Sequence, residues 1–199
     1  HPVADTVLSN GLCAGCWTRP GRCNSGKPGK YPNLLNRPAT RPPRALELPV
    51  DMIGVHPWDR LKLANGLVFQ RAIDPGIRGL AAHITRSCKN MRTESGPTTA
   101  RWVRRRMRYA MEAPDVELLQ GPYATLINKV GDCDDLAILW ASLVRSLGLR
   151  AYVGGVSAEA NKENLEHAVG VLVDDQDVWQ LFETINDKRY GGSDWPLIF

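Results

Sequence analysis

Long hydrophobic runs are missing from this sequence. The longest apolar stretch, Leu136–Val144, is far too short to cross a bilayer, so we expect no membrane span. A charged and then apolar leader is missing as well, so no signal peptide is visible. Because residue 1 is His rather than Met, we expect either a trimmed N-terminus or a numbering that begins inside a longer product. Targeting therefore stays open.

The chain has five cysteines, and this odd number argues against a framework built only of disulfides. Cys13, Cys16 and Cys23 crowd into the first 23 residues with the spacing of half a metal knuckle. Cys88 is the leading candidate for the fourth ligand. The other candidate donors are His1, His56 and His83. We predict zinc at this site, with an iron–sulfur cluster as the rival and a disulfide or free thiols as the plainer alternatives.

Positive charge gathers in the N-terminal third of the 199-residue chain. The net charge is +4, but residues 1–65 hold nine Lys and Arg against four Asp and Glu. Nine of the fourteen prolines lie in the same segment, where they block helix interiors. We predict an extended, basic, Pro-rich arm over 1–65 and a folded domain over 66–199. The arm is either a disordered tail or a segment lying on its own domain or on an acidic partner.

The rest of the chain has the pattern of an α+β fold, with helices first and an antiparallel sheet afterwards. Apolar periodicity and cap signals predict three helices, and β-rich runs predict three strands. The helices are expected over 74–90, 98–111 and 133–147, and the strands over 150–157, 167–174 and 178–184. Four arginines of the second helix, Arg101, Arg104, Arg105 and Arg108, share one face. We interpret it as a solvated face rather than a phosphate grip.

The run from Gly131 to Asp135 introduces the third helix and places a thiol at its first position. Unpaired N–H groups and the positive end of the helix dipole stabilise a thiolate there, as a cysteine nucleophile requires. Gly131 permits a tight approach into the helix. Asp132 can act as N-cap, and Asp135, three residues later, can complete a capping arrangement. The same carboxylates oppose thiolate formation at Cys133, so a nearby imidazolium would have to outweigh them.

His167 is the natural partner, because it opens a predicted strand after a polar loop. Glu183 lies near the end of the next strand. If the two strands pair through their turn, residues 167 and 183 meet at the same end of the hairpin, where a carboxylate can hold the imidazole in one tautomer. Taken alone, Cys133 is more often a small core residue, a strand His is more often structural, and a strand-end Glu is more often solvated. The hypothesis rests on all three occurring in order.

The stretch GDCDDLAILWASLVRSLGLRAYVGG resembles the core motif of the transglutaminase-like (papain-type) cysteine peptidases. The segment before it is similar to the GDCDD-type branch, which occurs in bacteria and tailed phages. The resemblance covers residues 98–184 and implies a transglutaminase-like fold, with N-terminal helices packed on a small antiparallel sheet. It also makes 66–199 the catalytic domain.

By this resemblance Cys133 is the nucleophile, His167 the base and Glu183 the third member, a position more often occupied by Asp in the family. Asp174 and Asp175, in the turn, are the fallback for that third position. The oxyanion hole would use the backbone N–H of Cys133 and one further donor, for which Gln120 is a candidate. Catalysis of this kind needs no cofactor.

Three functions are compatible with these observations. We favour a cysteine peptidase or amidase, or an acyltransferase, acting on a peptide or amide substrate through an acyl-enzyme. In a phage tail the substrate would be cell-wall peptide. The alternative is a virion structural or assembly protein whose arm docks on neighbouring subunits, and the third is a nucleic-acid-binding module. We expect a virion or the bacterial cytoplasm as the location.

Overall fold

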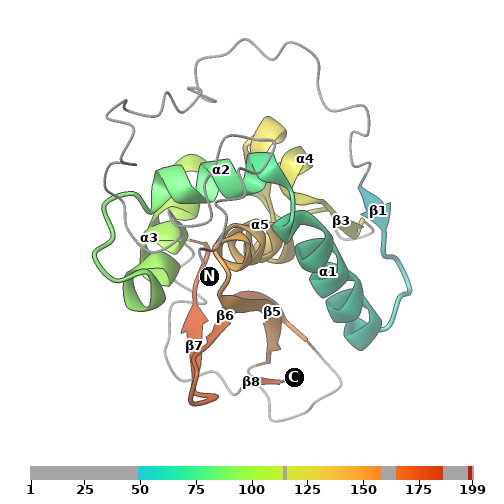
Figure 1. The fold of residues 1–199 in the computed structure, drawn as a ribbon. Coiled ribbons are helices and arrows are strands. Elements are labelled where there is room, and N and C mark those ends of the chain that lie inside the picture. The colour runs from blue at the N-terminus through green and yellow to red at the C-terminus, as the bar shows by residue number, and fades with distance from the viewer. Residues whose placement is uncertain (1–48, 114–115, 158–164, 186–196, 199) are drawn as a thin grey trace, which may run out of the picture. The chain divides into compact units, whose positions relative to one another are not determined.

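A helix that is buried on almost every side lies at the centre of the fold. The computed structural model describes residues 49–113, 116–157, 165–185 and 197–198, which fall within the unit Arg41–Phe199. In it, α5 (Cys133–Ser146) is surrounded by the other helices and a sheet (Figure 1). Eleven of its fourteen residues are buried. The predicted apolar stripe is therefore part of a helix that is enclosed nearly all round.

The helices around α5 begin where the sequence satisfies the open N–H groups of a first turn. The side chains of His56, Asp74 and Asn90 accept from such groups in the first three helices. Proline stands at the start of the first, second and fourth helices, where its missing N–H costs nothing. These helices are α1 (Pro57–Ala72), α2 (Pro75–Ile84), α3 (Met91–Arg106) and α4 (Pro122–Asn128).

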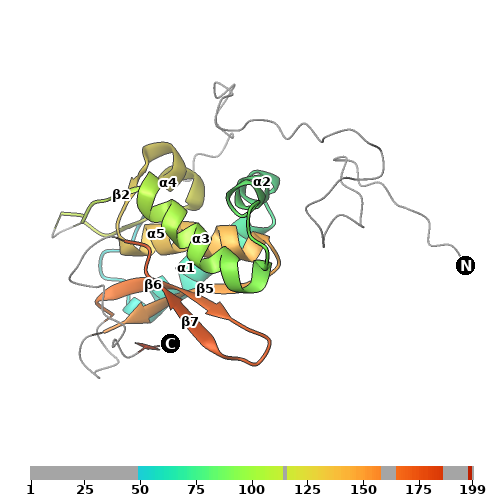
Figure 2. The same ribbon diagram turned by 90° about the vertical axis from the view of Figure 1, so that its left-hand side faces the viewer.

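An antiparallel sheet in the order β7-β6-β5-β8 forms the second layer (Figure 2). Its strands are β5 (Arg150–Val156), β6 (His167–Val173), β7 (Trp179–Phe182) and β8 (Leu197–Ile198). β6 and β7 form a hairpin that pairs from Val173 opposite Trp179 to Gly170 opposite Phe182. Helices packed on a small antiparallel sheet confirm the predicted α+β class.

Two short ladders hold the segments that precede α5. β1 (Val50–Asp51) pairs antiparallel with β3 (Leu118–Leu119). β2 (Arg108–Tyr109) pairs in parallel with β4 (Val130–Gly131), which runs directly into the first turn of α5. The start of α5 is thus fixed by strand pairing as well as by its own cap.

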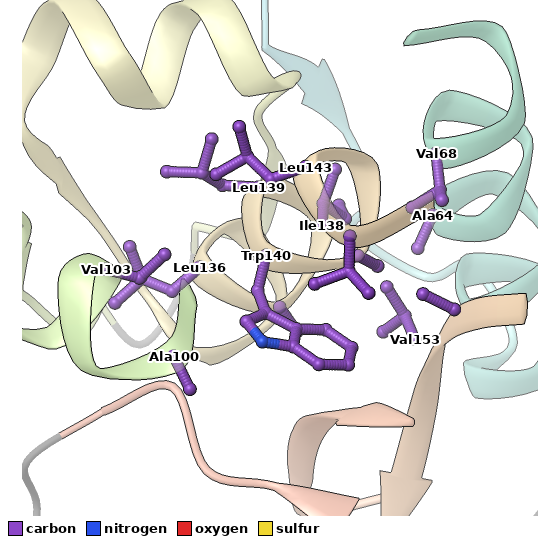
Figure 3. Packing of buried hydrophobic residues seen from close by; sticks show 14 of the residues in the cluster. Ala64, Val68, Ala100, Val103, Leu136, Ile138, Leu139, Trp140, Leu143 and Val153 are labelled. Atoms are coloured by element: carbon purple, nitrogen blue, oxygen red, sulfur yellow. The ribbon is translucent and has the colours of Figure 1, made fainter. Parts of the chain in front are cut away.

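Trp140 joins the helical layer to the sheet. Its ring lies between α5 and the strands, in the same core cluster as Ala100 and Val103 of α3 (Figure 3). A Cβ added to Gly170 of β6 would lie 2.3 Å from a ring carbon of Trp140. Phe182 of β7 stacks on the same indole, with 5.0 Å between the ring centroids. A glycine in β6 is therefore required for the helix to approach the sheet this closely.

The prediction of an extended arm up to residue 65 is wrong for its last part. Residues 57–65 lie in α1, whose Ala64 and Val68 are buried in the main core. Met52 is also buried, and β1 is paired with β3. Pro57 starts this helix rather than breaking it, because the first position of a helix needs no N–H. The predicted arm over 1–48 lies outside the described residues.

The second predicted helix is also displaced. α3 begins at Met91, seven residues before the expected start at Thr98, and it contains Pro97. It ends at Arg106 rather than at Met111, because Met107 adopts an extended conformation and the next two residues join β2. The first predicted helix is shorter than expected and ends at Ile84.

None of the helices in the described part of the chain combines the length and the apolar character that a membrane crossing requires.

Candidate active site

The chain presents Cys133 at the first position of α5, directly after β4. The Asp132 side chain accepts from the Asp135 N–H at 3.4 Å, and the Asp135 carboxylate accepts from the Asp132 N–H at 3.4 Å. This is the reciprocal capping box that the sequence predicts. Gly131 is needed beside it, since an added Cβ would lie 2.6 Å from Cβ of Asp135. The capping box therefore holds Cys133 at the start of the helix.

Gln120 forms hydrogen bonds to the first turn of α5 from outside the helix. Its backbone N–H donates to Asp135 Oδ1 at 2.7 Å, and its side-chain Nε2 donates to Asp135 Oδ2 at 2.5 Å. The Gln120 Oε1 accepts from Asn128 at 3.0 Å. The predicted oxyanion donor thus lies beside the first turn of α5, where one of its two amide hydrogens is engaged by Asp135. The sequence gives no signal for this contact, which joins residues fifteen apart through a loop and α4.

The Cys133 thiol lies against β6. Backbone N–H groups of Ala168 and Asp134 donate to it and lower its pKa, yet other effects outweigh them. Burial, followed by the negative charges of Asp132 and Asp134, raises the thiol pKa well above its usual 9.0. In its resting state the sulfur therefore carries its proton. The expectation that the flanking carboxylates oppose thiolate formation is confirmed in direction.

His167 and Glu183 meet as the hairpin register requires. His167 Nε2 lies 2.8 Å from Glu183 Oε2, and the imidazole is almost fully buried. The last pair of the ladder is Gly170 with Phe182, so Glu183 comes next to Val169 on the face that also carries His167. A carboxylate accepts at Nε2–H, and this tautomer leaves the Nδ1 lone pair as the basic site. Because Ala168 follows His167 and its N–H donates to the sulfur, the Cys133 thiol lies beside the end of β6 that carries His167.

The fallback residues lie at the opposite end of the hairpin. Asp174 accepts from the backbone N–H groups of Gln176 and Val178 within the turn. Asp175 forms an ion pair with Arg92. Glu183 is thus the carboxylate that the structure brings to His167.

Three carboxyl groups crowd around the first turn of α5. One oxygen each from Asp132, Asp134 and Asp135 lies within 4.8 Å of the others. Burial and then the Asp132 side chain, by hydrogen bond and charge, raise the pKa of Asp134 well above its usual range. Burial and the Asp132 charge raise the pKa of Asp135 to about 7. Asp134 and Asp135 therefore retain protons at pH values where ordinary aspartates are ionised, a property that the sequence run alone did not predict.

The predicted metal site stays a prediction. Cys88 is buried, and its thiol lies 3.5 Å from Thr98 Oγ1. Among the alternative donors, His83 is exposed and contacts Arg86. Cys13, Cys16, Cys23 and His1 lie outside the described residues.

One comparison with known proteins identifies the family of the chain. The sequence model of the transglutaminase-like superfamily matches residues 78–184, just over half of the chain. That range contains Cys133, His167 and Glu183. No curated protein matches the chain.

Two solved structures are similar in fold. One is a candidate protease from Parabacteroides distasonis, with 12% identity, 61% of this chain covered and a TM-score of 0.48. The other is a candidate cysteine protease from Cytophaga hutchinsonii, with 19% identity, 68% of this chain covered and a TM-score of 0.46. This chain covers 26% of the first protein and 48% of the second.

Proposed function

The chain belongs to the transglutaminase-like superfamily, and from that premise we propose that it is a cysteine hydrolase acting on amide bonds. Cys133 would attack the carbonyl carbon, His167 would accept and return the proton, and Glu183 would hold the imidazole in the required tautomer. The observation that carries the proposal is the His167–Glu183 pair, 2.8 Å apart, at the end of β6 that touches the Cys133 sulfur.

The protonation of the thiol determines how the first step would run. Because burial and two neighbouring carboxyl groups keep the Cys133 pKa high, the sulfur still carries its proton when the attack begins. His167 would therefore act as a general base during the attack, taking the sulfur proton as the carbon–sulfur bond forms. Glu183 then stabilises the imidazolium, which donates its proton to the leaving amine.

The negative oxygen of the tetrahedral intermediate needs donors near the sulfur. Cys133 is the first residue of α5, and a helix offers no internal acceptor to an N–H at that position. We assign this N–H as one oxyanion donor, and the second amide hydrogen of Gln120 as the other. Asp135 orients the Gln120 amide through its first hydrogen.

Water is the expected acceptor of the acyl group, so hydrolysis is favoured over transfer to an amine. A peptide or amide is the substrate that this chemistry requires. Cell-wall peptide as the substrate, a phage tail as the location and docking through the N-terminal arm stay predictions.

The proposal is tested by the reactivity of Cys133 in the full chain. The protein is treated with iodoacetamide between pH 5 and pH 10, and alkylation is followed by mass spectrometry of the peptide that contains Cys133. We expect His167→Gln and Glu183→Gln to slow alkylation at neutral pH, whereas His83→Gln, which changes an exposed histidine, leaves it unchanged. Equal rates in wild type and His167→Gln, with the profile of an isolated buried thiol, would refute the pairing.

Hydrolysis is measured separately, as new amino groups released from casein and from purified peptidoglycan. Loss of release in Cys133→Ala, with retention in Cys88→Ala, is the expected result. Release that survives in Cys133→Ala contradicts the assignment of the nucleophile.

A further inference from the structure

Glu183 is held by its backbone as well as by its side chain. The Arg104 side chain, from α3, donates through Nη1 to the backbone carbonyl of Glu183 at 2.5 Å. The two residues are 79 positions apart in the chain. The β6–β7 ladder has its last pair at Phe182, so this bond fixes the first residue beyond the ladder. A charged donor to a partly buried carbonyl is stronger than a neutral one.

Phe182, the residue before Glu183, also packs against α3. Phe182 stacks on Trp140, and an added Cβ at Gly96 of α3 would lie 2.8 Å from its ring. The Trp140 Nε1–H donates to the Gly96 carbonyl at 3.0 Å, which ties α3 to α5 at this point. Phe182 therefore packs against both α3 and α5.

The side chain of Glu183 uses both its oxygens. Oε1 accepts from the N–H groups of Thr184 and Ile185 at 2.8 and 3.0 Å. Oε2 faces His167 at 2.8 Å. Because the first two bonds come from the residues that follow Glu183, a shift of this backbone would move the carboxylate and its donors together. The distance between Glu183 Oε2 and His167 Nε2 therefore depends on the position of the Glu183 backbone. Arg104 fixes that position through its hydrogen bond to the Glu183 carbonyl.

We propose that Arg104 is a positioning residue of the active site, which holds the Glu183 backbone so that its carboxylate stays in register with His167. This inference rests on the proposed hydrolase function. It distinguishes Arg104 from Arg101 and Arg105, its exposed neighbours on α3. The arginine guanidinium presents several N–H donors in a fixed planar arrangement. A lysine side chain is shorter and presents a single ammonium group. Arg104→Lys is thus expected to restore the position of Glu183 only in part.

The test uses the full chain with Arg104→Met and Arg104→Lys, and Arg105→Met as the matched control. We expect Arg104→Met to lower kcat about 10- to 100-fold with little change in KM, the size of effect that a misplacement near 1 Å produces. Arg104→Lys is expected to lie between Arg104→Met and wild type, and Arg105→Met to match wild type. The pH profile of Cys133 alkylation in Arg104→Met should shift toward that of Glu183→Gln.

A double-variant cycle shows whether Arg104 acts through Glu183. In the Glu183→Gln background, Arg104→Met should lower the rate by less than about 3-fold, because the carboxylate that it positions is already gone. An equal loss in both backgrounds, or a wild-type rate and pH profile in Arg104→Met, overturns the inference. Thermal unfolding is recorded for each variant, and if Arg104→Met does not fold, Arg104→Lys carries the same cycle.

Failure of the proposed function would look different. In that case wild type itself would show no dependence of Cys133 alkylation on His167, whatever stands at position 104.

Discussion

Replacing Asp134 by Asn should stabilise the protein at neutral pH and weaken the dependence of its stability on pH. Asp134 lies in the first turn of α5, where burial and the Asp132 side chain raise its pKa well above the usual range. Its neighbour Asp135 has a pKa of about 7, raised by burial and by the Asp132 charge. Asn keeps the shape of the side chain and can still donate to Asp132, but it needs no proton and carries no charge.

The sign of the effect follows from proton binding. In the unfolded chain an aspartate ionises near its ordinary 3.8, whereas folded Asp135 holds its proton up to about 7. Between these values the unfolded state binds fewer protons, so the free energy of unfolding decreases as pH rises. At about 1.4 kcal/mol per pKa unit, Asp135 alone sets an upper limit of about 4 kcal/mol across this window. Removing the adjacent Asp134 should recover about 1–2 kcal/mol at pH 7.

Urea unfolding at half-unit steps from pH 5 to pH 7.5 measures both quantities. Wild type should lose stability across this range, and Asp134→Asn should lose less of it. Asp175→Asn is the matched control, because it removes an exposed carboxylate at the other end of the hairpin. If the stability of wild type rises with pH over this range, or if Asp134→Asn is less stable than wild type at pH 7, the assigned protonation of the cluster is wrong.

Two glycines give further predictions. Gly131→Ala would place a Cβ 2.6 Å from Cβ of Asp135, so we expect displacement of the capping box and at least 10-fold slower alkylation of Cys133, measured by peptide mass spectrometry. Gly170→Ala would press on the Trp140 ring at 2.3 Å and should cost about 1–3 kcal/mol in urea unfolding. Gly66→Ala is the control for both, because nothing lies within 4 Å of its added Cβ and alanine favours the interior of α1. It should stabilise the protein by about 0.5–1 kcal/mol, and destabilisation there would contradict the packing argument.

The sequence predicted those elements whose signals are local and repeated. α5 carries an apolar period over fourteen residues and a cap at each end, and its predicted start at Cys133 is correct. The β6–β7 hairpin has strong strand residues and an acidic turn, so its register brought His167 and Glu183 together as expected. A hairpin fixes long-range geometry from local information, because each residue's partner follows from the turn.

Elements without repetition were missed. β2 and β4 have two residues each, too few to show a period, and they pair in parallel across a gap in the sequence. The predicted start of α3, at residue 98, directly follows Pro97, whereas Asn90 caps this helix seven residues before that proline. The β2–β4 pairing depends on tertiary contacts, whereas the start of α3 follows from a local cap that the prediction did not use.

The contacts of the supporting residues could not be predicted for a related reason. Arg104 was expected on a solvated face, but its side chain turns to a backbone carbonyl 79 residues away. Gln120 was proposed from its position before the cysteine, and the structure gives its amide a partner in Asp135. Every residue has a backbone carbonyl, so the residue type at position 183 does not indicate that its carbonyl accepts a hydrogen bond from Arg104.

The electrostatics of the first turn of α5 determine the protonation of Cys133, the proposed nucleophile. A helix N-terminus favours a negative charge by about 0.3–1 kcal/mol, which corresponds to less than one pKa unit. Burial and the two flanking carboxylates act in the opposite direction and leave the Cys133 pKa well above 9.0. As Asp135 ionises near pH 7, one more negative charge forms in the same turn and opposes the thiolate further. A helix start of this composition therefore does not favour the thiolate by itself. The proposed hydrolase accordingly depends on His167 as the base, with Glu183 beside its Nε2 and Arg104 on the Glu183 carbonyl.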